Sequence, residues 1–199
     1  MMRCRWADPR SDLYVAYHDH EWGQPEHDDR KLFEMLILEG FQAGLSWLTI
    51  LNKREAFRTA FDYFEPAVVA QYGPEQVEAL MEDTGIVRNR RKILAAIQNA
   101  KVFLSIQEEF GSFDSYLWGF TGGQVILNTD DTPHTHTELS DRISKDLKRR
   151  GMNFVGTTII YSFLQATGVV NDHELACFCH PGNWSIPQNN NEVPSMEPR

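Results

Sequence analysis

Apolar side chains recur every three or four residues along most of this chain, a spacing that places them on one face of an α-helix. In residues 28–40, DDRKLFEMLILEG, an acidic start precedes an apolar stripe that extends from Leu32 to Ile37. Gly40 is expected to end this helix, because glycine is common just past a helix C-terminus. The pattern therefore favours helices over sheets.

Five more segments carry the same signal. Ser46 can cap a helix over 48–61, because a serine side chain accepts a hydrogen bond from the first helical turn. Pro74 suits the first turn of the next helix, and Thr157 or Thr158 can cap the last one. The remaining signals are apolar repeats and their glycine stops: Ile93, Ile97, Ala100 and Leu104; Leu139, Ile143 and Leu147 before Gly151; Ile160, Phe163 and Leu164 before Gly168.

The domain organisation follows from length and composition. Only residues 122–129, GGQVILNT, look like a strand, so the expected fold class is all-α with short loops. A chain of 199 residues suits one domain, or one domain of two lobes. We expect that domain to cover residues 1–183. Residues 184–199 are rich in Pro and Asn and lack periodicity, which predicts a disordered tail.

The chain shows no membrane or export signal. It has no run of eighteen apolar residues, and it is polar from Arg3 onward. The odd number of cysteines, Cys4, Cys177 and Cys179, fits a reducing compartment and argues against a disulfide framework. We therefore expect a cytoplasmic protein with no membrane partner.

The formal net charge of -9 argues against non-specific binding of nucleic acid through bulk charge. Basic residues nevertheless cluster in 88–92, RNRRK, and in 145–150, KDLKRR. Composition alone favours solvated helix faces for both clusters, but it leaves room for a local basic surface.

Cysteine and histidine residues lie near both ends of the chain. Cys4 and His18 are near the start, whereas His173 and Cys177 stand four residues apart near the end, where a helical turn would place them on the same side. Two thiolates and two imidazoles suit a closed, tetrahedral, structural Zn²⁺ site that would tie the termini together. The residues alone leave the alternative of unconnected side chains open, with Cys179, His180 and His20 as rival ligands.

Aromatic rings surround these candidate ligands, and a carboxylate follows an apolar stretch. Glu39 comes after residues 35–38, MLIL, and could hold a flat, cationic ligand against stacked rings. For an isolated glutamate, a solvated position at a helix end is the more common situation. The candidate rings are Trp6, Tyr14, Tyr17, Trp22 and Trp47.

Taken together, the motifs of this sequence resemble those of the 3-methyladenine DNA glycosylase I family, a branch of the helix–hairpin–helix DNA glycosylase superfamily. The resemblance covers roughly residues 3–183. It rests on RCRWA, LYVAYHDHEWGQP, KLFEMLILEGFQAGLSWLTILNKRE, TGIVRNRRKI, RRGMNFVGTTIIYSFLQATGVVNDH and CHPG.

The resemblance implies a two-lobed helical fold, a DNA-binding cleft and hydrolysis of the N-glycosidic bond of 3-methyladenine, which leaves an abasic site in double-stranded DNA. It also implies one structural zinc ion that joins the two ends of the chain. Carried over position by position, the family's zinc ligands fall on Cys4, His18, His173 and Cys177.

The resemblance assigns the remaining site residues as well. The carboxylate that binds the lesion falls on Glu39, the pocket rings fall on Tyr17 and Trp47, and Trp6, Tyr14 and Trp22 lie nearby. A loop with Gln42, Gly44 and Leu45 would probe the bases around the extruded nucleotide. A hairpin over 149–158 would offer backbone N–H groups to a phosphate. Its candidate residues are Arg149, Arg150, Gly151, Gly156 and Thr157.

This sequence differs from many members of the superfamily at two places that bear on the mechanism. Many members of the superfamily carry a catalytic Asp after the hairpin's second helix, where this chain has Asn171, with Asp172 one place further on. We therefore expect no Asp-driven mechanism, and Glu39 is one candidate for positioning the water. Thr157 and Thr158 stand where bifunctional members have a lysine, which predicts a monofunctional glycosylase without lyase activity.

Two other functions compete with this one. The first is a zinc-stabilised module that binds damaged DNA without cleaving it. The second is a hydrolase with an open metal near His18, Asp19, His20 and Glu21. A monomer is expected in each case.

Overall fold

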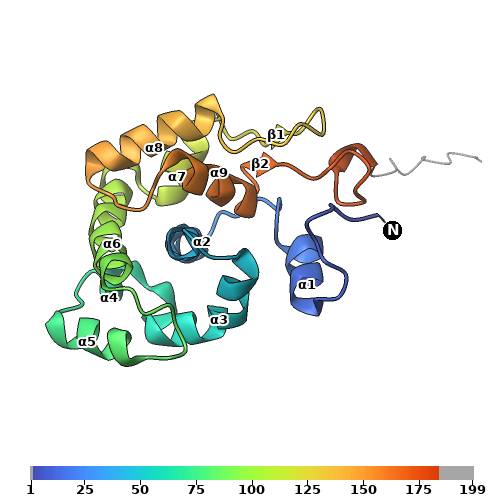
Figure 1. The fold of residues 1–199 in the computed structure, drawn as a ribbon. Helices are drawn as coiled ribbons and strands as arrows, with labels where there is room; N and C mark the ends of the chain where they lie inside the picture. The colour runs from blue at the N-terminus through green and yellow to red at the C-terminus, as the bar shows by residue number, and fades with distance from the viewer. Residues whose placement is uncertain (1, 184–199) are drawn as a thin grey trace, which may run out of the picture.

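The computed structural model describes residues 2–183 and is mostly helical (Figure 1), as the sequence pattern predicted. The expected tail over 184–199 lies outside the described residues. In chain order the elements are α1 (Asp12–His20), α2 (Asp29–Gln42), α3 (Trp47–Ala60), η1 (Asp62–Phe64), α4 (Pro66–Val69), α5 (Pro74–Glu82), α6 (Arg90–Phe110), α7 (Phe113–Gly119), β1 (Ile126–Leu127), α8 (Glu138–Arg150), α9 (Thr157–Ala166), β2 (Val170–Asn171) and η2 (Pro181–Asn183).

Several helix boundaries follow the local chemistry that the sequence predicted. The Ser46 hydroxyl accepts a hydrogen bond from the Thr49 N–H (3.2 Å) and so caps α3. Pro74 is the first residue of α5. Gly151 ends α8 with φ +102°, a left-handed conformation that favours glycine.

Two predicted boundaries are wrong. Helix α2 continues through Gly40 to Gln42, and the glycine instead allows close packing, since a Cβ there would lie 3.4 Å from the Phe154 Cβ. Neither Thr157 nor Thr158 caps α9, because the N-cap residue is Gly156. The Thr157 hydroxyl donates instead to the Asp141 carboxylate (2.5 Å).

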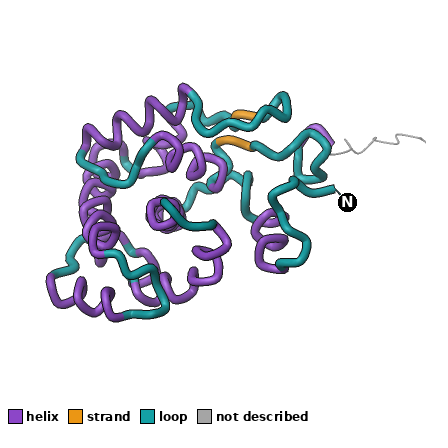
Figure 2. The backbone as a smooth tube through the Cα atoms, in the orientation of Figure 1, coloured by secondary structure: helices purple, strands orange, loops and turns teal. Residues whose placement is uncertain are grey.

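The predicted strand is shorter than expected and pairs with a segment that the sequence did not suggest. Within 122–129 only Ile126–Leu127 is a strand, and it lies parallel to Val170–Asn171 (Figure 2). The Ile126 and Asn128 N–H groups donate to the carbonyls of Val169 and Asn171, each at 2.9 Å. This short ladder holds the loop after β1 beside the end of α9.

Helix α2 runs through the centre of the molecule, with α3, α6, α7 and α9 packed around it (Figure 1). Every residue from Leu32 to Phe41 is buried. Burial of this apolar stretch is a main source of stability, and it carries Glu39 into the interior. Among the described residues, no helix combines the length and the hydrophobicity that a membrane span requires.

The N-terminal segment lies beside the C-terminal loop (Figure 1). The Phe178 N–H donates to the Met2 carbonyl (2.9 Å), and the Arg5 N–H donates to the Glu174 carboxylate (3.0 Å). These contacts hold the two ends of the described chain side by side.

Candidate active site and metal-ligand cluster

Four buried side chains from the two ends of the chain form a cluster. The donor atoms of Cys4, His18, His173 and Cys177 all lie within 4.8 Å of one another. The sulfur of Cys4 is 3.4 Å from Nδ1 of His173, and the sulfur of Cys177 is 3.4 Å from Nε2 of His18. Residues 172–180 form turns and contain no helix, so the expected helical turn between His173 and Cys177 is wrong. The Cys177 N–H donates to the Glu174 carbonyl instead (2.7 Å).

The second nitrogen of each imidazole is held by another group. Nδ1 of His18 lies 2.8 Å from the Asp19 carboxylate, and Nε2 of His173 lies 3.0 Å from the Trp22 carbonyl. Arg3 binds Asp19 through two nitrogens and holds the pKa of that carboxyl at about 2. Carboxylate and carbonyl partners of this kind fix the tautomer and orientation of metal-binding histidines.

The chemistry of the cluster suits a metal ion. Burial lowers the pKa of His173 to about 4, so its imidazole is neutral, as a ligand must be. Burial raises the pKa of the Cys4 thiol, and a bound cation would favour its thiolate. Backbone N–H groups of Glu174 and Cys179 already point at the two sulfurs (3.3 and 3.4 Å).

The rival ligands are not members of this cluster of four. Cys179 forms a second group with His18 and Asp19, and its sulfur lies 4.0 Å from the His18 carbonyl. The His180 ring contacts the Asn128 carbonyl (3.1 Å) and accepts a bond from Gly182. The His20 side chain is exposed.

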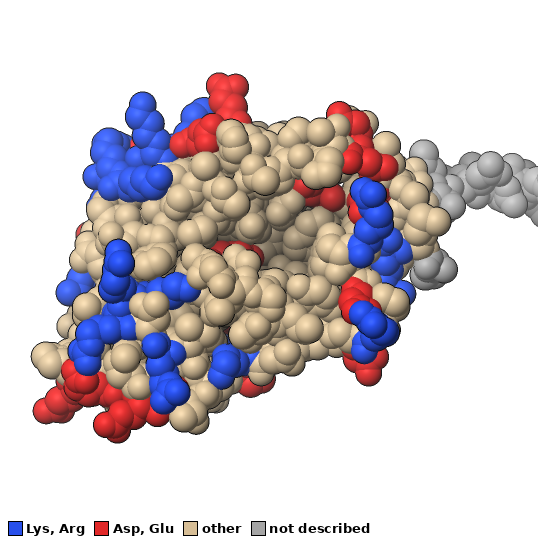
Figure 3. Space-filling view, viewed as in Figure 1, with Lys and Arg blue, Asp and Glu red and all other residues tan. Residues whose placement is uncertain are grey.

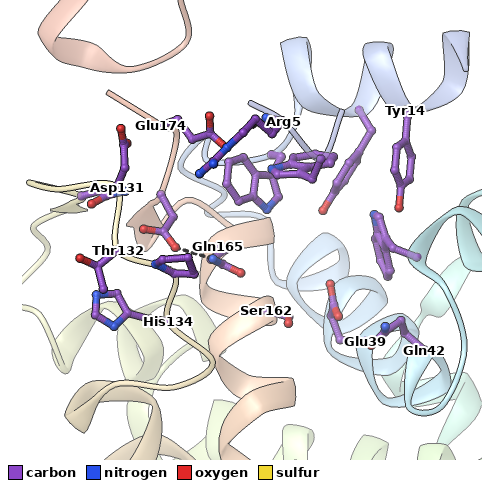
Figure 4. Close-up of a pocket in the computed structure, with 17 residues that line it drawn as sticks. Arg5, Tyr14, Glu39, Gln42, Asp131, Thr132, His134, Ser162, Gln165 and Glu174 are labelled. Atoms are coloured by element: carbon purple, nitrogen blue, oxygen red, sulfur yellow. Dashed lines mark hydrogen bonds and ion pairs between the residues drawn. The ribbon is translucent and has the colours of Figure 1, made fainter. Parts of the chain in front are cut away.

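A pocket of about 360 Å³ opens beside the cluster. It lies between the N-terminal segment, the C-terminal end of α2, the start of α3, the loop after β1 and α9 (Figure 4). Figure 3 shows a hollow in this face of the molecule, with acidic side chains inside it. The pocket is lined by four carboxyl groups, those of Glu39, Asp131, Asp172 and Glu174, and by the single guanidinium of Arg5. This balance of charge favours a cationic ligand.

The five predicted aromatic residues all line this pocket. The Tyr17 and Trp47 rings have centroids 5.5 Å apart, and Trp6 contacts Tyr14 edge to face at 5.5 Å. Trp22 lies 4.9 Å from Trp6. Rings of this kind offer flat surfaces on which a planar ligand can stack.

The aromatic wall also contacts the metal-ligand cluster. The ring centroids of Trp6 and His18 are 5.3 Å apart, and those of Trp22 and His173 are 4.7 Å apart. The cluster therefore supports one wall of the pocket from behind.

Glu39 is the buried carboxyl of the pocket, with 4% of its surface exposed. It extends from α2 into the cavity, opposite Tyr14 (Figure 4). Burial alone raises its pKa to about 8, because the low dielectric penalises the charged form. The predicted alternative of a solvated helix-end glutamate does not hold, since α2 extends beyond Glu39 and buries it.

A donor atom of the pocket lining also lacks a partner. The indole N–H of Trp47 is buried, and no described residue accepts a hydrogen bond from it. Burial, and then the nearby Glu39 carboxyl, raise the pKa of Tyr17 far above its usual value, which keeps the phenol neutral. The pocket thus presents unused hydrogen-bonding capacity to a ligand.

Sequence reasoning missed part of the pocket. Asp172 lines it, and its carboxylate accepts bonds from the Tyr161 hydroxyl (2.7 Å) and the Gln165 amide (2.6 Å; Figure 4). Asn171, by contrast, donates to the Gly23 carbonyl. The spacing of Tyr161, Gln165 and Asp172 offers no recognisable signal, because their contact depends on how the chain turns after α9.

The predicted DNA contacts lie in two segments. Gln42 lines the pocket, and its amide donates to the Leu45 carbonyl (2.9 Å) across a turn in which Gly44 has φ +80°. Leu45 is 39% exposed. The second segment joins α8 to α9 and contains Gly151 and Gly156.

The two predicted arginines at the end of α8 are engaged in ion pairs. Arg149 pairs with Asp146, whereas Arg150 pairs with Asp146 (2.7 Å) and Glu109 (2.6 Å). Arg149 remains largely exposed, but Arg150 is mostly covered.

The fold and site define a class of helical protein with an aromatic pocket around a buried carboxyl, a setting suited to a flat, cationic ligand. Comparison with known proteins makes the class specific. A family model for methyladenine glycosylase matches residues 6–180. DNA-3-methyladenine glycosylase 1 of Escherichia coli (strain K12) is 50% identical over 186 residues, which are 92% of this chain and 99% of that relative.

Solved structures agree. A crystal structure of 3-methyladenine DNA glycosylase I matches with a TM-score of 0.87 and 50% identity, and covers 90% of this chain and 100% of the other. A variant of 3-methyladenine DNA glycosylase I in complex with 3-methyladenine matches with a TM-score of 0.85 and 38% identity, and covers 89% of this chain and 96% of the other.

The chain belongs to the methyladenine glycosylase family. The resemblance that its motifs indicated is thereby confirmed, as is the expectation of an enzyme of the DNA-3-methyladenine glycosylase class.

Proposed function

We propose that this protein hydrolyses the N-glycosidic bond of 3-methyladenine in double-stranded DNA, releases the free base and leaves an abasic site. The observation that carries this proposal is the Glu39 carboxyl, buried without a neighbouring cation in a pocket with aromatic walls. A carboxyl in that setting is suited to a flat ligand that brings its own positive charge.

The chemistry of the lesion fits this environment. Methylation at N3 makes adenine cationic in DNA, so the base is already a good leaving group. Glu39 would favour the cation and accept a hydrogen bond from the exocyclic amine. Stacking on Tyr17 and Trp47 would add roughly 1–3 kcal/mol per ring. Normal adenine carries no positive charge. It would therefore not offset the free-energy cost of the buried Glu39 carboxylate.

The base must first leave the helix stack, at a cost of a few kcal/mol. Leu45, which is exposed at the turn after α2, would occupy the gap in the duplex. The first turn of α9 has no side-chain cap, which leaves its N–H groups available to a phosphate. Together α8, the segment after it and α9 would form the helix–hairpin–helix unit. Lys and Arg side chains gather on the same face as the hollow (Figure 3).

We infer that the four-residue cluster holds one structural zinc ion. Cys4, His18, His173 and Cys177 supply the two sulfur and two nitrogen donors of a closed zinc site. When bound, the ion would supply stability rather than chemistry, by joining the two ends of the chain behind the pocket wall.

We further propose that residues 1–183 act as one two-lobed, monomeric domain, with the pocket between the lobes. A monofunctional reaction is the best-supported one, because no lysine is among the described residues that line the pocket. A lyase step needs such an amine to form a Schiff base.

Chromatography of the bases released from methylated duplex DNA tests this function. Release of 3-methyladenine, with 7-methylguanine retained, is the expected result. A folded, metal-loaded protein that binds the lesion but releases no base would replace the enzyme with a lesion-binding module.

A further inference from the structure

One face of helix α6 carries two buried polar side chains among apolar ones. Lys92 is 8% exposed and Asn99 is 3% exposed. They stand seven residues apart, which is about two turns or 10 Å along the helix, and therefore lie on the same face. A buried ammonium or amide is costly unless it is hydrogen-bonded, so the partners of these groups identify their purpose.

Lys92 binds the end of α2. Its ammonium donates to the carbonyls of Phe41 (2.8 Å) and Ala43 (2.7 Å). The last carbonyls of a helix have no partner within the helix, and a cation there also favours the helix dipole. The loop that follows, residues 43–46, contains the exposed Leu45, and Lys92 fixes its first residue.

Asn99 binds the segment between α8 and α9. Its amide donates to the Asn153 carbonyl (2.8 Å), and its carbonyl accepts from the Asn153 N–H (2.8 Å). The next residue, Phe154, has φ +54° and packs against Gly40 of α2. The segment 151–156 is therefore anchored to the same face of α6 as the loop.

We propose that Lys92 and Asn99 are positioning residues, which set the distance between loop 43–46 and segment 151–156 so that both engage one DNA duplex together. The inference rests on the proposed function, which assigns those two segments to DNA. Neither residue lines the base pocket. Both side chains form hydrogen bonds with backbone groups. Substitution of side chains in the two segments would leave these backbone partners present.

Lys92→Met and Asn99→Leu test this role separately, because each removes one anchor and keeps much of the side-chain volume. Lys101→Met is the matched control, since it removes an exposed lysine from the same helix. For each protein we would measure the Kd for a duplex that carries a non-hydrolysable abasic-site analogue by fluorescence anisotropy and the Kd for free 3-methyladenine by tryptophan fluorescence. Circular dichroism would verify folding.

We expect the duplex Kd to rise at least tenfold in both variants, with the free-base Kd unchanged within twofold and the control equal to wild type. A purely structural role would leave both constants unchanged in a folded variant or impair both together, and either result overturns the inference. If one of the two variants fails to fold, the Kd values of the other still test the inference. Because duplex binding is measured without excision, a wild-type protein that releases no base refutes the proposed function and not the positioning role.

Discussion

The Asp19 carboxylate lies 2.8 Å from Nδ1 of His18, on the side of the ring opposite the cluster of donor atoms. Asp19 is itself fixed by Arg3 (2.7 Å). We expect Asp19→Asn to weaken zinc affinity roughly 10–100-fold, as loss of such an outer partner typically does. Competition with a chromophoric chelator measures this affinity. Asp12→Asn, an exposed change on the same helix, is the control, and equal affinity in the two variants would contradict the role of Asp19.

Loss of a sulfur donor should be more severe. Cys4→Ser is expected to lower the zinc content well below one ion per chain and to reduce the Tm, because both ends of the chain depend on the cluster. Cys179→Ser should keep the metal, since Cys179 lies outside the cluster of four. Elemental analysis and thermal melting distinguish them, and a fully loaded Cys4→Ser protein would remove Cys4 from the ligands.

Glu39→Gln tests recognition of the charged base. The amide keeps the size of the side chain but loses its negative charge, so we expect kcat/KM for 3-methyladenine in duplex DNA to fall about 100-fold, in the range for loss of one electrostatic contact. Glu108→Gln, an exposed change on α6, should have no effect. Wild-type excision by Glu39→Gln would exclude Glu39 from both recognition and catalysis.

The pH dependence should report the same carboxyl. Burial raises the pKa of Glu39 to about 8, so below pH 8 the free enzyme must release a proton before Glu39 can pair with a cation. We expect kcat/KM to decrease about tenfold per pH unit from pH 8 towards pH 6. Glu39→Gln should abolish this slope, and a slope that persists in the variant would assign it to another group.

The free energy of unfolding should change with pH in the direction opposite to that of kcat/KM. A carboxyl with a raised pKa in the folded protein contributes stability below its unfolded pKa, and this contribution is lost as pH rises through about 8. Glu39→Gln should therefore be more stable than wild type at pH 9, by on the order of 2–4 kcal/mol, and similar to it at pH 4. Urea titrations at both pH values measure the difference, and an equal difference at the two would argue against ionisation of a buried Glu39.

The sequence predicted most of the helices, because in those segments the local signals for helix starts and ends agree with the side chains that are buried. The apolar stripes of α2 and α6, the Ser46 cap and the Gly151 stop all have local signatures. Helices α1, α4 and α7 were not predicted. In α1 the polar and aromatic residues lack a clean stripe, and the helix packs on α3.

The site could be predicted only in part. Chemical type identified the cluster of cysteine and histidine residues and the aromatic rings. The burial of Glu39 was not visible, because it depends on the continuation of α2 through Gly40 and on the helices packed around α2. The sequence also did not indicate the contact of Asp172 with Gln165 or that of Lys92 with the end of α2, because each contact depends on tertiary geometry.

The cluster that joins the two ends also dictates when the pocket can form during protein synthesis. Trp6, Tyr14 and Tyr17 leave the ribosome early, but the side chains that hold their segment in place, His173 and Cys177, are among the last of the described residues to be made. A nascent chain therefore cannot complete the base pocket before His173 and Cys177 have been made.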